Sequence, residues 1–169
     1  MASALTTANA ATLTSSQVRA LTTSDIAEAP NGAFEALSSA QLAWLSTAAV
    51  RAMTELQLQS LDSKELQAMS PVQISALTLE QFNLLDSSQV VSLTTAQIRV
   101  LGSAQLLGLT QSEIQALSGG QLRALTTQQL RALDSNVISA LLPSQVGGLS
   151  TSQIGSLVSG QIAALTTSQ

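Results

Sequence analysis

The sequence contains no cysteine, no histidine and no tyrosine. Without them the chain has no disulfide bonds, no thiol nucleophile, none of the usual zinc ligands and not the most common general base. The only candidate axial ligands for a haem are Met1, Met53 and Met69, which makes haem ligation improbable. We therefore predict a protein that is not an enzyme, with no catalytic residue, no cofactor-binding residue and no metal ligand.

Charged residues are scarce as well. They make up 9% of the chain, with a formal net charge of −4, where soluble proteins usually carry about a quarter. Five arginines and one lysine give no basic patch, so we predict no binding of nucleic acid. No segment approaches the roughly 18 consecutive apolar residues of a membrane span. The first residues lack a basic and apolar leader, so no secretory signal is visible, and the sequence alone leaves the location open.

The chain is built from an octapeptide. Counting positions 1 to 8, position 1 is Leu or Met every eighth residue from Leu5 to Leu165, with Ala29 as the one exception. Position 6 is a large apolar residue from Val18 to Ile162. A full copy is the segment Leu93–Val100, LTTAQIRV.

Positions 2 and 5 of the octapeptide predict the start of a helix. Position 2 is Thr, Ser, Asp or Gly in 18 of 21 units, and position 5 is Gln or Glu in 16 of 21. This is the pattern of a capping box, and positions 1 and 6 then form the hydrophobic staple around it. Pro71 and Pro143 both fall at position 3, the first helical residue, where a missing N–H costs nothing. The sequence therefore predicts an all-α solenoid with one short capped helix in each octapeptide.

Other architectures fit the period less well. In a single long helix, eight residues rotate the apolar stripe by about 80°, so no continuous seam forms. A regular strand alternates with period two, which positions 1 and 6 do not match. A β-solenoid with a turn in each octapeptide stays open as the alternative, and the Thr-Thr pairs would suit ice binding on such a fold.

The number of helices in one coil of the solenoid is two or three. Asp62 and Asp86 are three octapeptides apart, and Asp134 follows after six more. Pro71 and Pro143 are nine octapeptides apart. All of these intervals are multiples of three octapeptides, which favours three helices for each coil.

We predict a single domain over residues 1–169. Residues 1–28 are degenerate N-terminal repeats, residues 29–32 form a turn-like interruption, and residues 33–169 are regular repeats. The C-terminal segment places Ile162 and Leu165 in the last layer, where we expect exposed apolar surface.

The charged side chains follow the same register. All five arginines lie at position 7, which we expect to face solvent and to serve solubility. Six of the ten carboxylates lie at positions 2 or 5, where a helix-capping role suffices: Asp25, Asp62, Glu65, Asp86, Glu113 and Asp134.

The segments Ala20–Ile26, ALTTSDI, and Ala124–Leu133, ALTTQQLRAL, resemble the ALTTxQIxAL octapeptide arrays of large bacterial surface or secreted proteins. Such proteins are often labelled adhesins or haem-utilisation or haemagglutinin-like proteins. The resemblance covers nearly the whole chain and implies a repeat architecture, a bacterial source and a position outside the cell.

These features together predict a structural repeat protein that acts as a rod, a spacer or a self-assembling scaffold. The expected partner is another copy of the chain, bound end to end, because a solenoid without a polar cap exposes its stacking face. The alternative is a binding module or adhesin that uses one face for a carbohydrate, a surface, ice or a protein partner.

Overall fold

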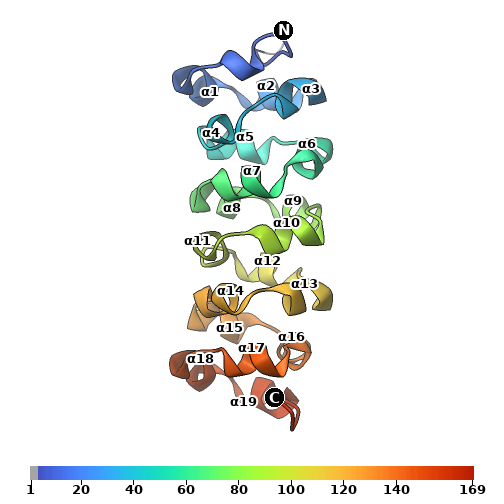
Figure 1. The fold of residues 1–169 in the computed structure, drawn as a ribbon, viewed down its shortest axis with the longest axis vertical. Coiled ribbons are helices and arrows are strands. Elements are labelled where there is room, and N and C mark those ends of the chain that lie inside the picture. The colour runs from blue at the N-terminus through green and yellow to red at the C-terminus, as the bar shows by residue number, and fades with distance from the viewer. Residues whose placement is uncertain (1–3) are drawn as a thin grey trace. The chain divides into compact units, whose positions relative to one another are not determined.

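The computed structural model describes residues 4–169, and these residues form short helices and no strand. The all-α prediction is confirmed, and the β-solenoid alternative is wrong for this part of the chain. The chain divides between Leu93 and Thr94 into two compact units, each of which is an all-α solenoid (Figure 1).

The first unit contains a 3-10 helix and ten α-helices, one for each octapeptide. They are η1 (Ala10–Thr12), α1 (Ser15–Ala20), α2 (Thr23–Ala27), α3 (Asn31–Glu35), α4 (Ser39–Leu42), α5 (Thr47–Arg51), α6 (Glu55–Ser60), α7 (Ser63–Ala68), α8 (Pro71–Ala76), α9 (Leu79–Asn83) and α10 (Ser87–Ser92).

The second unit continues the same order. It contains α11 (Thr95–Ile98), α12 (Ser103–Leu107), α13 (Gln111–Ala116), α14 (Gly119–Ala124), α15 (Thr127–Ala132), α16 (Ser135–Ala140), α17 (Pro143–Gly147), α18 (Thr151–Ser156) and α19 (Ser159–Ala164).

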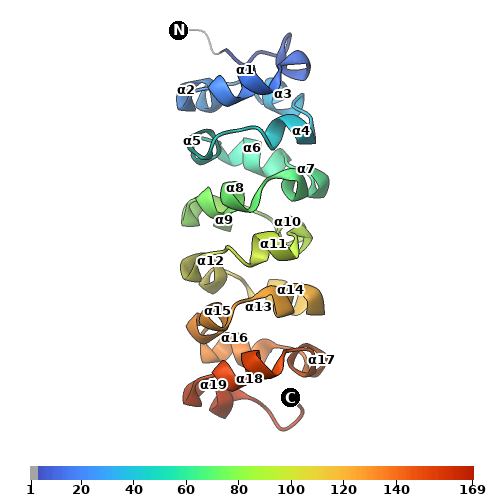
Figure 2. The same ribbon diagram turned by 90° about the vertical axis from the view of Figure 1, so that its left-hand side faces the viewer.

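Within each unit, helices pack against the helix three places further along the chain. In the first unit, α2 packs on α5, α3 on α6, α4 on α7, α5 on α8 and α7 on α10. In the second unit, α11 packs on α14, α12 on α15, α13 on α16, α15 on α18 and α16 on α19. The perpendicular view shows the resulting layers in each unit (Figure 2). One coil therefore has three helices, as the spacing of the aspartates and prolines predicts.

The capping box begins most of these helices. In α11 the Thr94 hydroxyl accepts a hydrogen bond from the N–H of Gln97 at 3.2 Å, and the Gln97 side-chain oxygen accepts one from the N–H of Thr94 at 2.8 Å. Pro71 and Pro143 stand at the first helical position, as predicted. The Asp134 side chain makes no capping bond, contrary to the prediction, and position 5 of this octapeptide is Val137, which has no amide to complete the box.

The predicted interruption at residues 29–32 includes the start of a helix. Pro30 is the N-cap residue of α3 and makes no side-chain capping bond, and the helix begins at Asn31. Ala29 is buried in the core place of the usual leucine. The interruption therefore removes a cap and leaves the octapeptide register intact. The single-domain organisation over residues 1–169 stays a prediction.

The core of each unit consists of positions 1 and 6. Position-1 side chains from Leu21 to Leu157 are buried, and so are position-6 side chains from Val18 to Val146. A single octapeptide buries too little apolar surface to offset its ordering entropy, which is about 1–2 kcal/mol per residue for the backbone alone. Stability therefore comes from one coil stacking on the next.

We expect Thr94→Ala to lower the free energy of unfolding by roughly 0.5–2 kcal/mol, because the N–H of Gln97 loses its capping acceptor. The matched control is Thr95→Ala, since Thr95 is exposed and is the first residue of the helix itself. That change should stay within about 0.5 kcal/mol. Urea denaturation followed by circular dichroism measures both, and equal losses would contradict a capping role for Thr94.

Candidate functional site

The side chains with the most specific arrangement are the glutamines at position 5. In α8 the Gln73 side-chain oxygen accepts a hydrogen bond from the N–H of Ser70 at 2.7 Å, which closes the capping box. The Gln73 side-chain nitrogen donates to the carbonyl oxygens of Leu42 and Leu45, both at 2.8 Å. Gln73 is only 2% exposed, so its two bonds to the preceding coil are buried, while the capping bond from Ser70 is part-buried. One amide thus caps its own helix and binds the corner between α4 and α5 in the preceding coil.

The same bond recurs in both units. In the glutamines named below, the side-chain nitrogen donates to a position-6 carbonyl, to the position-1 carbonyl that follows it, or to both, always in the preceding coil. The donors whose acceptors lie in the same unit are Gln41, Gln57, Gln73, Gln81 and Gln89 in the first unit, and Gln129, Gln145, Gln153, Gln161 and Gln169 in the second. We call this set the glutamine ladder.

The ladder has two kinds of acceptor. The position-6 carbonyl also accepts from the N–H of the position-1 residue that follows, as Leu42 does from Leu45 at 3.1 Å, whereas the position-1 carbonyl is left open by the helices. The carbonyl of Leu45 follows the end of α4 and precedes the cap of α5, so it lies outside the helical hydrogen-bond pattern. A buried carbonyl without a donor is costly, and a satisfied neutral bond contributes about 0.5–1.5 kcal/mol. The ladder therefore joins coils through the main chain and needs no particular side chain in the coil that accepts it.

Position 5 was predicted to cap its own helix only, so the ladder was missed. The preference for glutamine over glutamate at position 5 is the sequence feature that indicates a partner outside the helix. Position 5 has 14 glutamines and only two glutamates, Glu65 and Glu113, although either side chain closes a capping box. Only the amide also donates a hydrogen bond, so the excess of glutamine reflects a second partner.

Position 7 provides a further bond between coils, and here the solvent-facing prediction is incomplete. The exposed Arg51 donates from Nε to the carbonyl of Ala76 at 3.1 Å, and Arg123 donates to the carbonyl of Gly148 at 2.6 Å. Gln115 makes the equivalent bond to Ala140 at 2.9 Å. In each case the acceptor belongs to the coil that follows. These long side chains therefore also fasten a coil to its successor.

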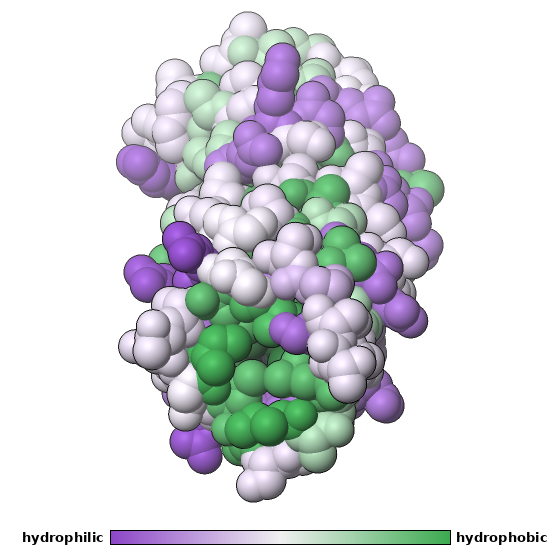
Figure 3. Space-filling model, turned by 60° about the horizontal axis from the view of Figure 1, so that its bottom comes forward, coloured by the Kyte–Doolittle hydropathy of each residue, from purple (hydrophilic) through white to green (hydrophobic). Residues whose placement is uncertain are grey.

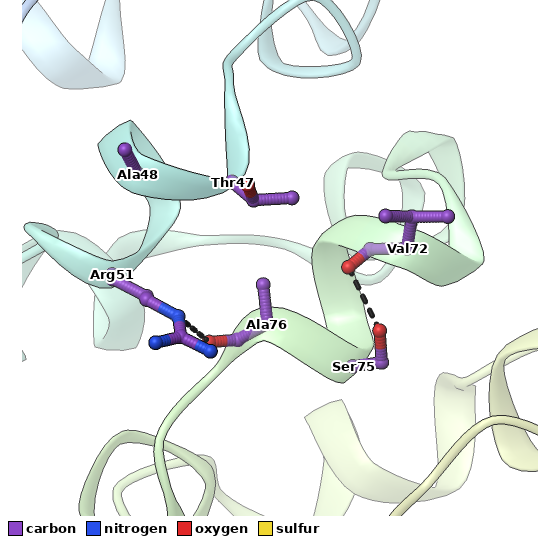
Figure 4. A pocket seen from close by; sticks show the side chains of 6 residues that line it. All are labelled: Thr47, Ala48, Arg51, Val72, Ser75 and Ala76. Atoms are coloured by element: carbon purple, nitrogen blue, oxygen red, sulfur yellow. Dashed lines mark hydrogen bonds between the residues drawn. The ribbon is translucent and has the colours of Figure 1, made fainter.

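A shallow pocket of about 380 Å³ lies between α5 and α8. Figure 4 shows its lining, in which Arg51 reaches across to the carbonyl of Ala76 and the Ser75 hydroxyl donates to the carbonyl of Val72 at 2.9 Å. The other lining residues are Thr47 and Ala48. The lining has one cation and two hydroxyls, with no carboxylate or other base beside them. The pocket is a groove between stacked helices, and its hydroxyls lack an activating partner.

No cluster of three or more acidic side chains that could hold a metal ion occurs among residues 4–169. In the same part of the chain, no helix is long and apolar enough to cross a bilayer. The predicted absence of catalytic, cofactor and metal residues stays a prediction.

The last coil of the second unit has an exposed apolar face, which we call the C-terminal end face. It contains Ile154, Val158 and Ile162, which are 40%, 39% and 56% exposed. Position-6 side chains from Val18 to Val146 are at most 7% exposed, because a following coil covers them. Figure 3 shows this apolar surface from the C-terminal side. The predicted exposure of Ile162 is confirmed, while Leu165 is half-buried.

The first coil of the first unit is closed by its own chain. The Asn9 side-chain nitrogen donates to the carbonyl of Ala4 at 2.9 Å, and the N–H of Ala4 donates to Asp25 at 2.7 Å. The bond from Ala4 is the main cause that lowers the pKa of Asp25, and bonds from the Thr22 hydroxyl and N–H add to it. A lowered pKa means that this carboxylate contributes stability above its ordinary pKa and loses it as the pH falls through the folded value.

Isosteric replacement of a glutamate at position 5 tests the ladder. The register of the ladder places Glu65 where glutamine would donate to the carbonyls of Phe34 and Leu37 in the preceding coil. We expect Glu65→Gln to raise the free energy of unfolding by about 1–2 kcal/mol, because it adds a donor and removes a charge beside Asp62. Glu80→Gln, at an exposed site in α9, changes the charge equally and should stay within about 0.5 kcal/mol. Thermal and urea denaturation of both variants provide the measurement, and equal effects would show that the donor contributes nothing.

Comparison with known families agrees with the repeat architecture. Residues 58–95 and 114–151 each match the family described as ALTTAQ repeat. Together they cover less than half of the chain. This supports a repeat family and leaves the adhesin and haemagglutinin context untested. A comparison with curated proteins finds no match.

Proposed function

We propose that the chain is a non-enzymatic structural repeat protein, a self-assembling scaffold of a bacterial surface or secreted system. The observation that carries this proposal is the glutamine ladder. Its acceptors are main-chain carbonyls at fixed places in every octapeptide, as for Gln73 on Leu42 and Leu45. Any coil of this repeat can therefore accept any other coil that has glutamine at position 5, whatever stands at positions 3, 4 and 7.

The C-terminal end face supports assembly beyond one chain. Ile154 and Ile162 occupy the place that a following coil covers elsewhere, and covering them with a second copy removes their apolar surface from water. A contact between unlike ends is heterologous and does not close on itself, so it builds filaments. The low charge of the chain does not oppose such contacts.

The surface or secreted setting and the adhesin alternative rest on the resemblance to octapeptide arrays of bacterial surface proteins. A binding module would use a lateral groove such as the one at Arg51, which combines a guanidinium with hydroxyl groups. The scaffold is favoured because the glutamine ladder and the position-7 bonds both join one coil to another, while that groove is shallow.

We expect the purified chain to associate as its concentration rises, because the C-terminal end face binds a second copy. Sedimentation velocity over a concentration series measures this association. Ile162→Lys should weaken it by placing a charge in the contact. Val72→Lys is the control, since Val72 is 64% exposed in the first unit, outside the C-terminal end face. A strict monomer at every concentration would rule out self-assembly and leave an isolated structural spacer.

A further inference from the structure

The first two coils each have one glutamine at position 5; the other two position-5 residues are alanines in the second coil, Ala33 and Ala49, and polar residues in the first. In the next coil Gln41 donates to the carbonyls of Ala10 and Leu13, at 2.8 and 3.0 Å. The first coil has Asn9, Gln17 and Asp25 at this position. A carboxylate cannot donate, and the shorter asparagine reaches less far. Only one of the three residues therefore keeps the amide that would bind another coil.

The two substituted residues hold the chain's own N-terminal segment. Asn9 binds the carbonyl of Ala4 and Asp25 binds its N–H, so both main-chain groups of one residue are clamped between them. Asn9 is fixed further, because its side-chain oxygen accepts from the N–H of Thr6 at 2.9 Å. Leu5, the next residue, is fully buried. We call Ala4, Asn9 and Asp25 the N-terminal clamp.

A pocket lies beside this clamp. It has a volume of about 260 Å³ and is lined by Ala4, Asn9, Leu13, Gln17, Ala20 and Leu21. Four of the six lining residues are apolar. Gln17 is exposed and has the side-chain amide that is usual at position 5 of the octapeptide. The Asn9 amide in the lining is bound to Ala4, so the pocket offers apolar walls and the Gln17 amide as donor. These suit an apolar side chain from the C-terminal end face together with a main-chain carbonyl.

We propose that the N-terminal clamp limits end-to-end association between two copies of this chain. Asn9 and Asp25 stand where glutamines of a first coil would bind the carbonyls of another copy's last coil. In the clamp their side chains bind Ala4 of the same chain instead. The clamp leaves Gln17 as the single ladder donor and sets the carboxylate of Asp25 where a donor is needed. The inference rests on the proposed self-assembly and describes its regulation. Association between copies then strengthens when Asn9 and Asp25 of the clamp are replaced by glutamine.

The test is the double variant Asn9→Gln/Asp25→Gln, which gives the first coil glutamine at all three position-5 sites. We expect its association constant, measured by sedimentation with the full chain, to rise by at least about tenfold, since two donors are added. The matched control for charge is Glu28→Gln, an exposed residue close to Asp25 in the sequence, which should leave the constant unchanged. Adding Ile162→Lys to the double variant should abolish the gain, which shows that the contact uses the C-terminal end face.

The outcomes separate the clamp from the proposed function. If the unmodified chain associates and the double variant is no tighter, the clamp is overturned and self-assembly stands. If the unmodified chain is monomeric and the double variant associates, the clamp is supported and self-assembly of the natural chain fails. If neither associates while circular dichroism shows both folded, both ideas are overturned.

Discussion

Replacement of Ile98 by aspartate is expected to unfold the coil that contains α11, and Arg99→Ala, one residue later, is expected to change little. Ile98 is fully buried, so the new carboxylate would lose its water without gaining a partner. We expect a loss above about 4 kcal/mol in the free energy of unfolding. The side chain of Arg99 is exposed, and its truncation should cost less than about 0.5 kcal/mol.

Urea denaturation followed by far-UV circular dichroism measures both variants. If the aspartate variant does not fold, Ile98→Val provides a milder test, with an expected loss of about 0.5–1.5 kcal/mol for one deleted methyl group. Equal effects at residues 98 and 99 would mean that position 6 does not form the core. The contrast between neighbouring residues makes the result independent of any general fragility of the chain.

Much of the fold follows from the octapeptide because its signals are local. A capping box joins residues three apart, as Thr94 and Gln97 are joined here. The staple likewise acts within a single unit, between positions 1 and 6. The coil size was also accessible, because residues such as Asp62 and Asp86 repeat at the spacing of stacked helices.

The ladder was harder to predict because its two partners lie in different coils, far apart in the sequence, and one of them is the main chain. A main-chain carbonyl is present at every residue, so the sequence does not mark it as an acceptor. The bond from Arg51 to Ala76 was missed for the same reason. The clamp at Ala4 was missed because Asn9 and Asp25 look like degenerate repeats until their common partner is known.

The exposed end was predictable only in part. Ile162 lies in the last helix of the described residues, where no further coil covers position 6, and it is 56% exposed. Leu165 was predicted alongside it and is half-buried. Position 1 therefore keeps some shielding in the last layer, while position 6 relies on the next coil.

The decisive test of the ladder is a pair of neighbouring substitutions in α15. We expect Gln129→Glu to lower the free energy of unfolding by about 2–4 kcal/mol at neutral pH, because a buried side chain loses its donor and gains a charge. Gln129 is 7% exposed and donates to the carbonyls of Ile98 and Leu101 at 3.1 and 2.9 Å. Gln128→Glu adds the same charge one residue earlier at an exposed site and should stay within about 0.5 kcal/mol.

The pH dependence of this pair identifies the cause. A carboxylate at residue 129 faces carbonyl oxygens in a buried site, so its folded pKa should lie above its unfolded value of about 4.3. Its penalty is then fully present at neutral pH and diminishes as the pH falls through the folded pKa, where the protonated acid donates a hydrogen bond again. The difference between the two variants should therefore shrink toward a pH of about 4.

Glu65 and Glu113 occupy position 5 naturally, so the chain folds with a carboxylate there, and the expected cost lies in stability. Urea denaturation at several pH values gives both free energies on the same scale. If Gln128→Glu and Gln129→Glu lose equal stability at neutral pH, the donated bonds make no net contribution. Stacking would then depend on apolar burial at positions 1 and 6 alone, and the preference for glutamine at position 5 would have to arise from the capping box.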